Sequence, residues 1–213
     1  MPRANHHSTH EIVIMTRILS LLFFCSGVSA IIYQIVWQRV LFASFGTDIE
    51  SITIIVSVFM LGLGLGSLIG GAMSNASEKK LINYFIFFEM SIGLFGLISI
   101  PLIEYISQAT LNLSGGWWLP FIVFAILVIP TFAMGATLPV LVTYLFKQTK
   151  SVGNSVTRLY YINTLGSAIG CLVTVGILFV IGTRQSTIYI AALLNFLIAL
   201  LTYIYSRKKP ATV

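Results

Sequence analysis

The sequence contains very little charge. Of its 213 residues, 8% are charged and 57% are hydrophobic, whereas charged residues make up about 25% of a typical soluble domain. So few polar side chains cannot cover the surface of a water-soluble fold, which excludes a soluble globular protein. The formal net charge of +6 is spread thinly over short connections, so we expect no basic face for nucleic acid.

Patterns that carry metal, redox or hydrolytic chemistry are also lacking. Cys25 and Cys171 lie inside apolar runs without a CxxC partner, which is typical of small buried thiols. His6, His7 and His10 belong to a polar tail ahead of an apolar run, and such tails are more often disordered than metal-binding. The sequence has no HExxH segment, no paired carboxylates at one depth and no Ser–His constellation. We therefore expect no enzymatic activity, no metal and no cofactor.

Long apolar runs dominate the chain instead. About 20 apolar residues are needed for a helix to cross the hydrocarbon core of a bilayer. Six stretches qualify, at 17–45, 50–74, 81–106, 117–146, 153–182 and 185–206. The first is too long for a cleaved signal peptide, so we expect it to remain as an anchor, with Met15 as an alternative start. The prediction is an all-α, polytopic membrane domain over 17–206, between a polar cytoplasmic tail at 1–16 and a basic cytoplasmic tail at 207–213.

The basic residues predict the orientation of these spans, because cytoplasmic loops are enriched in Lys and Arg. With a cytoplasmic N-terminus, the residues that fall inside are Arg3, Arg17, Lys79, Lys80, Lys147, Lys150, Arg207, Lys208 and Lys209. Only Arg39 and Arg184 then lie toward the outside, together with the acidic residues Asp48, Glu50 and Glu104. We expect both termini in the cytoplasm and the domain in the bacterial inner membrane.

A short motif occurs twice. "LGSLIGG" begins at Leu65 in the second run, and "LGSAIGC" begins at Leu165 in the fifth. These two spans run in opposite directions, which predicts two three-helix units related by inversion, as in each half of a major-facilitator transporter. Each copy holds a GxxxG pair, namely Gly66 with Gly70 and Gly166 with Gly170. This spacing favours close helix packing, and a sliding surface or a dimer seam are the alternatives.

The fourth run carries "PTFAMGATLP". Pro130 and Pro139 each remove a backbone hydrogen bond, and Gly135 between them adds flexibility. The pattern predicts a kinked helix, in which Thr131 or Thr137 satisfies a freed carbonyl. A broken helix that forms a substrate site is the alternative.

Ionisable residues within spans are expensive and are functional candidates by default. Glu89 lies about eight residues into the third span and Arg158 about five residues into the fifth, from the same side of the membrane. Their similar depth predicts that Glu89 faces Arg158 or a watery cavity, and that Asn163 joins this network. A structural ion pair and a transport or proton role remain open for Glu89.

The segment "YQIVWQR" in the first run holds further polar groups. Arg39 lies near the outer surface, and its depth favours pairing with Glu104, Asp48 or Glu50, with extension to the outer lipid headgroups as the alternative. Tyr33 and Trp37 share one helix face and Gln34 and Gln38 the next. Because these side chains point in different directions, we expect them to form a packing hub, not a ligand-binding stripe.

Five segments together resemble a known family. They are "FFCSGVSAIIYQIVWQRVLFASFGT", "VFMLGLGLGSLIGG", "FEMSIGLFGLIS", "PTFAMGATLPVLVTYL" and "RLYYINTLGSAIGCLVTVGIL". Over about residues 15–206, the chain is similar to the N-terminal membrane domain of bacterial membrane-bound spermidine synthase-like proteins. In that family a soluble aminopropyltransferase domain follows, whereas this chain ends at "SRKKPATV". The resemblance therefore places no catalytic residue here, and any such activity would come only through a partner.

Two functions follow as expectations. The first is a non-catalytic integral membrane module that anchors, docks or regulates a partner, either a spermidine synthase-like enzyme or another envelope complex. The alternative is a transporter or half-transporter of a small metabolite, with cations such as polyamines included, that acts as a dimer. The expected partners are membrane lipid and either another membrane or membrane-associated protein or a second copy of the chain, without nucleic acid.

Overall fold

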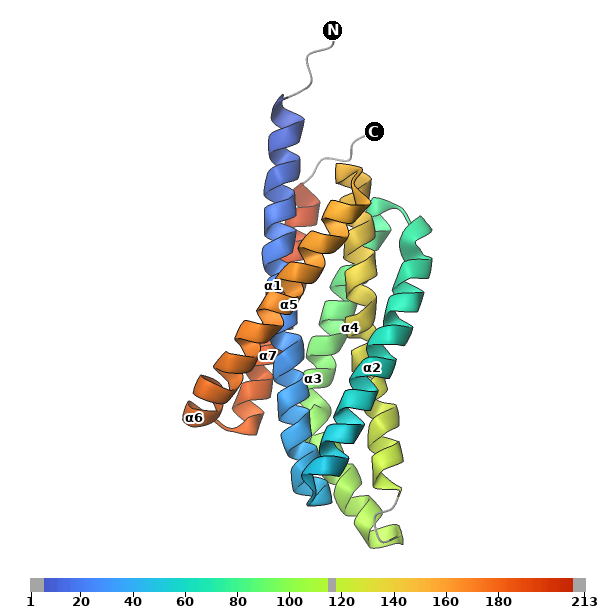
Figure 1. Ribbon diagram of the computed structural model, residues 1–213, viewed down its shortest axis with the longest axis vertical. Helices are drawn as coiled ribbons and strands as arrows, with labels where there is room; N and C mark the ends of the chain where they lie inside the picture. The colour runs from blue at the N-terminus through green and yellow to red at the C-terminus, as the bar shows by residue number, and fades with distance from the viewer. Residues whose placement is uncertain (1–5, 115–117, 209–213) are drawn as a thin grey trace.

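The computed structural model describes the backbone of residues 6–114 and 118–208, and the side chains of 13–110 and 118–207. The long helices are α1 (His6–Phe45), α2 (Asp48–Ala72), α3 (Glu78–Ser114), α4 (Leu119–Thr149), α5 (Val152–Val173) and α7 (Arg184–Lys208). They stand side by side in an elongated bundle (Figure 1). A 3-10 turn, η1 (Met73–Asn75), ends the second span. A π-helical turn, η2 (Thr174–Leu178), and the short α6 (Phe179–Ile181) continue the fifth.

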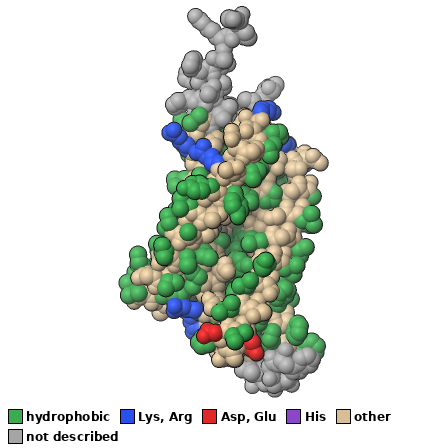
Figure 2. Space-filling view, in the orientation of Figure 1, with side chains coloured by type: hydrophobic (Ala, Val, Ile, Leu, Met, Phe, Trp, Pro, Cys, Tyr) green, Lys and Arg blue, Asp and Glu red, His purple; other side chains and the backbone are tan. Residues whose placement is uncertain are grey.

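Six of these stretches are long and apolar enough to cross a membrane. They are Val13–Phe45, Asp48–Asn75, Glu78–Thr110, Leu119–Thr149, Val152–Ile181 and Arg184–Arg207. The prediction of an all-α polytopic membrane protein with six spans is therefore confirmed for the described chain, and the protein is a multi-pass membrane protein. Apolar side chains cover most of its flank in Figure 2, as contact with lipid requires.

The first span begins earlier than expected. The tail predicted at 1–16 overlaps α1, which begins at His6, and Met15 is buried against the bundle. The Tyr144 hydroxyl contacts the Met15 sulfur at 3.5 Å. Residues 6–16 were assigned to the tail because most of them are polar, but the apolar run 12–15 already belongs to α1, and tertiary contact holds Met15. The side chains of the three N-terminal histidines lie outside the described part of the chain.

The two ends of the bundle differ in charge. α1 begins and α7 ends at the same end of the molecule (Figure 1), where the even number of spans brings Arg17, Lys79 and Arg207 together. Figure 2 shows only basic side chains at this end, and acidic side chains beside further basic ones near the opposite end. Asp48 and Glu50 lie at that opposite end, in the first turn of α2, where the helix dipole favours negative charge.

The helix contacts repeat between the two halves of the bundle. α2 packs against α4, and α5 packs against α1; α3 packs against α4, and α1 packs against α7. Suppose that α1, α2 and α3 of one unit correspond to α4, α5 and α7 of the other. The α2–α4 contact then corresponds to the α5–α1 contact, and the α3–α4 contact corresponds to the α7–α1 contact. The α3–α7 contact corresponds to itself. α2 and α5 run in opposite directions (Figure 1). The packing thus follows the inverted three-helix repeat predicted from the duplicated motif.

Both glycine pairs lie in close helix contacts within the chain. A methyl group on Gly66 would collide with the Phe132 carbonyl oxygen of α4, and one on Gly166 would collide with the Phe24 carbonyl oxygen of α1. The second glycine of each pair is equally close to its neighbour, Gly70 to α4 and Gly170 to α1. The structure therefore uses both motifs for packing between neighbouring helices of one chain.

α4 continues as a single helix through Pro130 and Pro139, so it is not broken at either proline. Pro139 lacks an N–H, which frees the carbonyl of Gly135, four residues earlier. Ser67 of α2 donates a hydrogen bond of 3.1 Å to this carbonyl. A Cβ at Gly135 would collide with the backbone of Leu63, so glycine here permits the close approach of α2. Thr131 and Thr137, the two residues expected to satisfy a freed carbonyl, donate instead to the carbonyls of Leu127 and Met134.

The predicted packing hub is centred on two aromatic rings. Tyr33 and Trp37 are fully buried and stack at 5.2 Å between ring centroids. The Trp37 indole N–H donates to the Ser99 hydroxyl at 3.0 Å, which satisfies its polar atom inside the core. Gln34 and Gln38 are only half-buried. Tyr33 and Trp37 therefore form the hub, and the two glutamines lie at its margin.

Candidate functional site

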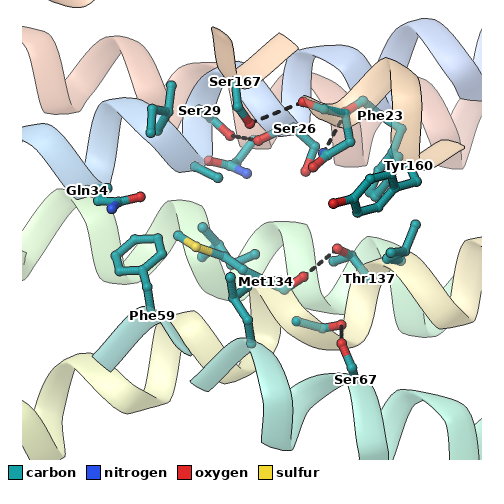
Figure 3. A pocket seen from close by; sticks show the side chains of 18 residues that line it. Phe23, Ser26, Ser29, Gln34, Phe59, Ser67, Met134, Thr137, Tyr160 and Ser167 are labelled. Carbon is teal, nitrogen blue, oxygen red and sulfur yellow. Dashed lines mark hydrogen bonds between the residues drawn. The ribbon is translucent and has the colours of Figure 1, made fainter. Parts of the chain in front are cut away.

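A cavity of about 240 Å³ lies where the two three-helix units meet. Its walls come from all six long helices, as the cut-away view in Figure 3 shows in part. The contributing residues come from the middle of the spans, for example Ser26 and Gln34 of α1, Ser67 of α2, Asn163 of α5 and Asn195 of α7. The cavity therefore lies near the midplane of the membrane.

One wall of the cavity is polar and the other is largely apolar. Ser26, Ser29 and Ser167 lie together on the α1–α5 side, and Phe59 and Met134 face them from α2 and α4 (Figure 3). The polar side is assembled because Gly27 lets α5 approach α1: a Cβ there would collide with the Asn163 carbonyl. An amphipathic cavity of this kind suits a small solute that has both a polar group and an apolar body.

Glu89 lies directly behind the polar wall. It is fully buried in α3. The Ser26 hydroxyl donates to its Oε1 at 2.7 Å, and the Asn195 amide donates to its Oε2 at 2.6 Å. Both donors line the cavity. A buried carboxylate is therefore linked to the cavity through two hydrogen-bonded side chains, one from α1 and one from α7.

The predicted contact between Glu89 and Arg158 is wrong. Arg158 is exposed, and its Nε donates to the Ser20 hydroxyl at 3.0 Å. The reason is the order of the helices: α5, which carries Arg158, packs on α1, whereas α3, which carries Glu89, packs on α7. The depth estimate was sound, but depth does not say which helices are neighbours.

Asn163 is separate from the Glu89 contacts but lies in the same cavity. Its amide donates to the Phe23 carbonyl at 3.1 Å. The Ser167 hydroxyl, one turn further along α5, lies within 3.1 Å of the Gly27 and Asn163 carbonyls. The predicted network of Glu89, Arg158 and Asn163 therefore does not form. The three residues contact α1 at different positions, namely Ser26, Ser20 and Phe23. Of the three, Asn163 lines the cavity and Glu89 reaches it through Ser26 and Asn195.

Arg39 does not have the predicted acidic partner. Its guanidinium carbon lies 3.9 Å from the centroid of the Phe179 ring, a distance typical of a cation–π contact. Phe179 belongs to α6, at the outer end of the fifth span. The side chains of Glu104 and Asp48, predicted to form an ion pair with Arg39, are exposed. A planar guanidinium can stack on a ring and stay hydrated at its edge, which suits a site at the membrane surface.

Sequence analysis did not single out Asn195 or Ser26. Asn195 is the one strongly polar residue in the apolar stretch "AALLNFLIAL", and a lone amide in mid-span is a usable signal because its desolvation must be compensated. Ser26 carries a weaker signal, since serine often bonds to its own helix backbone. Only the packing of α1, α3 and α7 shows that both residues meet Glu89.

Comparison of the chain with protein-family models, with curated proteins and with solved structures gave no match. The resemblance to the membrane domain of spermidine synthase-like proteins therefore stays an expectation from sequence motifs. The cavity and its polar contacts supply the basis for a functional assignment.

Proposed function

We propose that this protein binds a small polar solute in its central cavity and moves it across the membrane, as one half of a dimeric transporter. The observation that carries the proposal is the position of the cavity. It lies in mid-span, at the junction of two units whose contacts repeat. Secondary transporters built from inverted repeats place their substrate sites at this position.

The buried carboxylate adds support. A charged group in mid-membrane is costly and is retained where it serves a substrate, an ion or a proton. Glu89 is fully buried, and its contacts lead to Ser26 and Asn195 in the cavity wall. A purely structural anchor needs neither the carboxylate nor the cavity.

Uptake into proteoliposomes tests the proposal. Vesicles that contain the chain are given a panel of radiolabelled small cations, neutral solutes and anions, with protein-free vesicles as background. Ala30 lines the cavity, so Ala30→Phe fills part of it and is expected to abolish uptake. Ala125 is exposed on α4 and does not line the cavity, so Ala125→Phe is the matched control and should transport normally. Uptake that is equal with and without the protein would contradict the proposal.

A second candidate is a docking module for another protein, favoured by the uneven burial of the helices. Within their apolar windows, the second and fifth spans bury 28% and 17% of their residues, against 44–50% for the other four. Another membrane protein or a second copy of the chain would cover these two helices. Isolation from native membranes in mild detergent tests this candidate, and recovery of the chain alone as a monomer would count against it.

The cellular setting follows from the charge distribution. Because the end that holds Arg17, Lys79 and Arg207 is the more basic, we place it, with both termini, in the cytoplasm and the protein in the bacterial inner membrane.

A further inference from the structure

From the cavity wall we infer that the solute is a small primary ammonium ion with a single positive charge and a short apolar body. This inference rests on the proposed function of the cavity and specifies the chemistry of its ligand. It is carried by the direction of the hydrogen bonds in the wall, by one buried acceptor and by the count of charged groups.

Most hydrogen-bond donors on the polar side of the cavity already bond to other groups of the protein. An ionised carboxylate only accepts hydrogen bonds, so Glu89 takes the hydroxyl proton of Ser26 and an amide proton of Asn195. Five more side chains of the wall donate to backbone carbonyls: Ser29 to Ser26, Ser67 to Gly135, Thr137 to Met134, Asn163 to Phe23 and Ser167 to Gly27. The Gln34 amide and the Tyr160 hydroxyl also line the cavity and make no such bond with the described residues. Next to Glu89, where Ser26 and Asn195 lie, the wall therefore offers mainly lone pairs to a ligand.

Asn195 supplies the clearest of these acceptors. The residue is 1% exposed and lines the cavity. Among the described side chains, its Oδ1 is one of three buried polar atoms without a hydrogen-bond partner, and the other two belong to Tyr33 and Thr187, which do not line the cavity. An unsatisfied buried acceptor is costly. This oxygen has almost no accessible surface, so a ligand N–H group beside Asn195 would satisfy it after a small rotation of the amide.

The charged groups around the cavity also favour a ligand with one positive charge. Glu89 is a single carboxylate, and no Lys, Arg or His is among the described residues that line the cavity. A buried carboxylate without a counter-charge is strongly unfavourable, and a ligand ammonium would supply that charge at short range. One carboxylate balances one ammonium, so a second positive charge in the cavity would be left uncompensated. The site should therefore prefer a monoammonium ion to a diammonium ion.

The opposite wall and the volume limit the rest of the ligand. Phe59 and Met134 face the polar side (Figure 3) and offer apolar contact. A cavity of about 150 Å³ holds benzene, so by proportion the 240 Å³ here hold on the order of ten non-hydrogen atoms. A short alkyl or aryl group fits beside the ammonium, and a long chain does not.

The test is equilibrium binding to the full chain in lipid nanodiscs, with five probes. They are butylammonium, 1-butanol, butyrate, tetramethylammonium and 1,4-butanediammonium. We expect butylammonium to bind at least about tenfold more tightly than each of the others, a difference that corresponds to one charge-assisted hydrogen bond. Tetramethylammonium tests the need for N–H donors, and the diammonium tests the single charge. A probe that equals or exceeds butylammonium would overturn the inference.

Variants locate the site. Glu89→Gln keeps the shape and removes the charge, and Asn195→Leu removes the acceptor; each should weaken butylammonium binding by about tenfold or more. Thr187→Val is the matched control, because it deletes another unpartnered buried polar atom on α7, outside the cavity, and should bind normally. Thermal denaturation checks that each variant is folded. Unchanged binding by folded Glu89→Gln or folded Asn195→Leu would also overturn the inference.

The outcomes separate the ligand class from transport. Tight butylammonium binding without uptake into vesicles would support the ligand class and contradict the transport proposal. Uptake of a neutral or anionic solute that Ala30→Phe abolishes would support transport and overturn the ligand class. No binding by any probe would overturn the ligand class, whereas uptake equal to that of protein-free vesicles for every solute would contradict transport.

Discussion

At the scale of single residues, the account depends on Glu89. Its carboxylate is held by one hydroxyl and one amide, and its charge is what the cavity presents to a ligand. Two titratable side chains of α1, the Cys25 thiol and the Tyr33 phenol, lie within electrostatic reach of Glu89. A thiol and a phenol keep their protons at neutral pH, so Glu89 is the group whose protonation changes the charge of this region.

This predicts a pH dependence with a definite sign. When Glu89 takes up a proton, the wall loses its negative charge and also gains a donor, and both changes disfavour an ammonium ion. Butylammonium affinity should therefore fall as pH falls, by up to about tenfold per pH unit in the range where Glu89 titrates. Calorimetry over a pH series measures this. Glu89→Gln should give a flat profile, and parallel profiles for the two proteins would contradict the assignment.

Tyr33 gives a prediction about stability. Its hydroxyl is buried without a partner among the described residues, so Tyr33→Phe removes an unsatisfied polar group and keeps the ring stack on Trp37. We expect stability to be unchanged or raised by about 1 kcal/mol. The comparison variant Trp37→Phe loses the hydrogen bond to Ser99 as well as buried area, and should lose about 2 kcal/mol or more. Thermal denaturation in detergent distinguishes the two variants. A large loss of stability in Tyr33→Phe would show that the Tyr33 hydroxyl has a partner.

The sequence was sufficient to find Glu89 and Asn163 as polar residues in spans, and it was not sufficient to pair them. Glu89 was assigned to Arg158 by depth, although α3 and α5 are not neighbours. Ser26 and Asn195 are 63 and 106 positions from Glu89 along the chain. Such contacts depend on which helix faces meet, and a hydropathy pattern carries no information about that.

At the scale of helices, the account depends on close contacts made by glycine. Gly66 and Gly64 lie two residues apart on α2, but only Gly66 touches α4; a Cβ at Gly64 would meet nothing within 4 Å. Gly66→Ala should therefore destabilise the protein by about 1–3 kcal/mol through overpacking. Gly64→Ala should be neutral or stabilising by about 0.5–1 kcal/mol, because alanine favours the helix. Thermal denaturation of the matched pair gives the answer, and equal effects would mean that α2 and α4 are less close than described.

The contact between Ser67 and Pro139 predicts a coupling. Ser67 donates to the Gly135 carbonyl, which Pro139 leaves without its helical partner. Ser67→Ala should lower the free energy of unfolding of the natural protein by about 1 kcal/mol. The loss should be smaller in a Pro139→Ala background, because an N–H at position 139 can then bond to the Gly135 carbonyl. A double-mutant cycle measures the coupling energy. Strictly additive effects would show that the serine does not compensate for the proline.

Helix positions were largely predictable, because each span is a long apolar run bounded by polar or charged residues. The first helix is the exception: polar residues before Arg17 concealed helical structure that begins at His6. The packing role of the GxxxG pairs was the favoured prediction, since four-residue spacing aligns two glycines on one face. Which helix each pair contacts, α4 or α1, required the structure.

At the scale of the whole molecule, the repeated contacts and the unequal charge of the two ends make one prediction about topology. Single cysteines introduced at Lys79 and Arg207 should react with an impermeant reagent from the same side of the membrane, and one introduced at Asp48 should react from the other side. The natural Cys25 and Cys171 are half-buried and should first be replaced by alanine. Labelling of positions 79 and 48 from one side would contradict the six-span arrangement.

The whole molecule also explains why a cavity exists in so small a protein. Two units pack through α3 and α7 and through the glycine contacts of α2 and α5. This leaves a space where the six helices meet in mid-membrane. The fold class was predictable from composition alone. The cavity was not, because it is a property of how two units fit together.

The most direct test of the central claim is the comparison of solute uptake by proteoliposomes that contain the natural protein, Ala30→Phe or Ala125→Phe. The account predicts uptake above protein-free vesicles for the natural protein and for Ala125→Phe, and background uptake for Ala30→Phe, with all three equally folded and inserted. Equal uptake by Ala30→Phe and the natural protein would show that solute does not pass through this cavity, and would contradict the account.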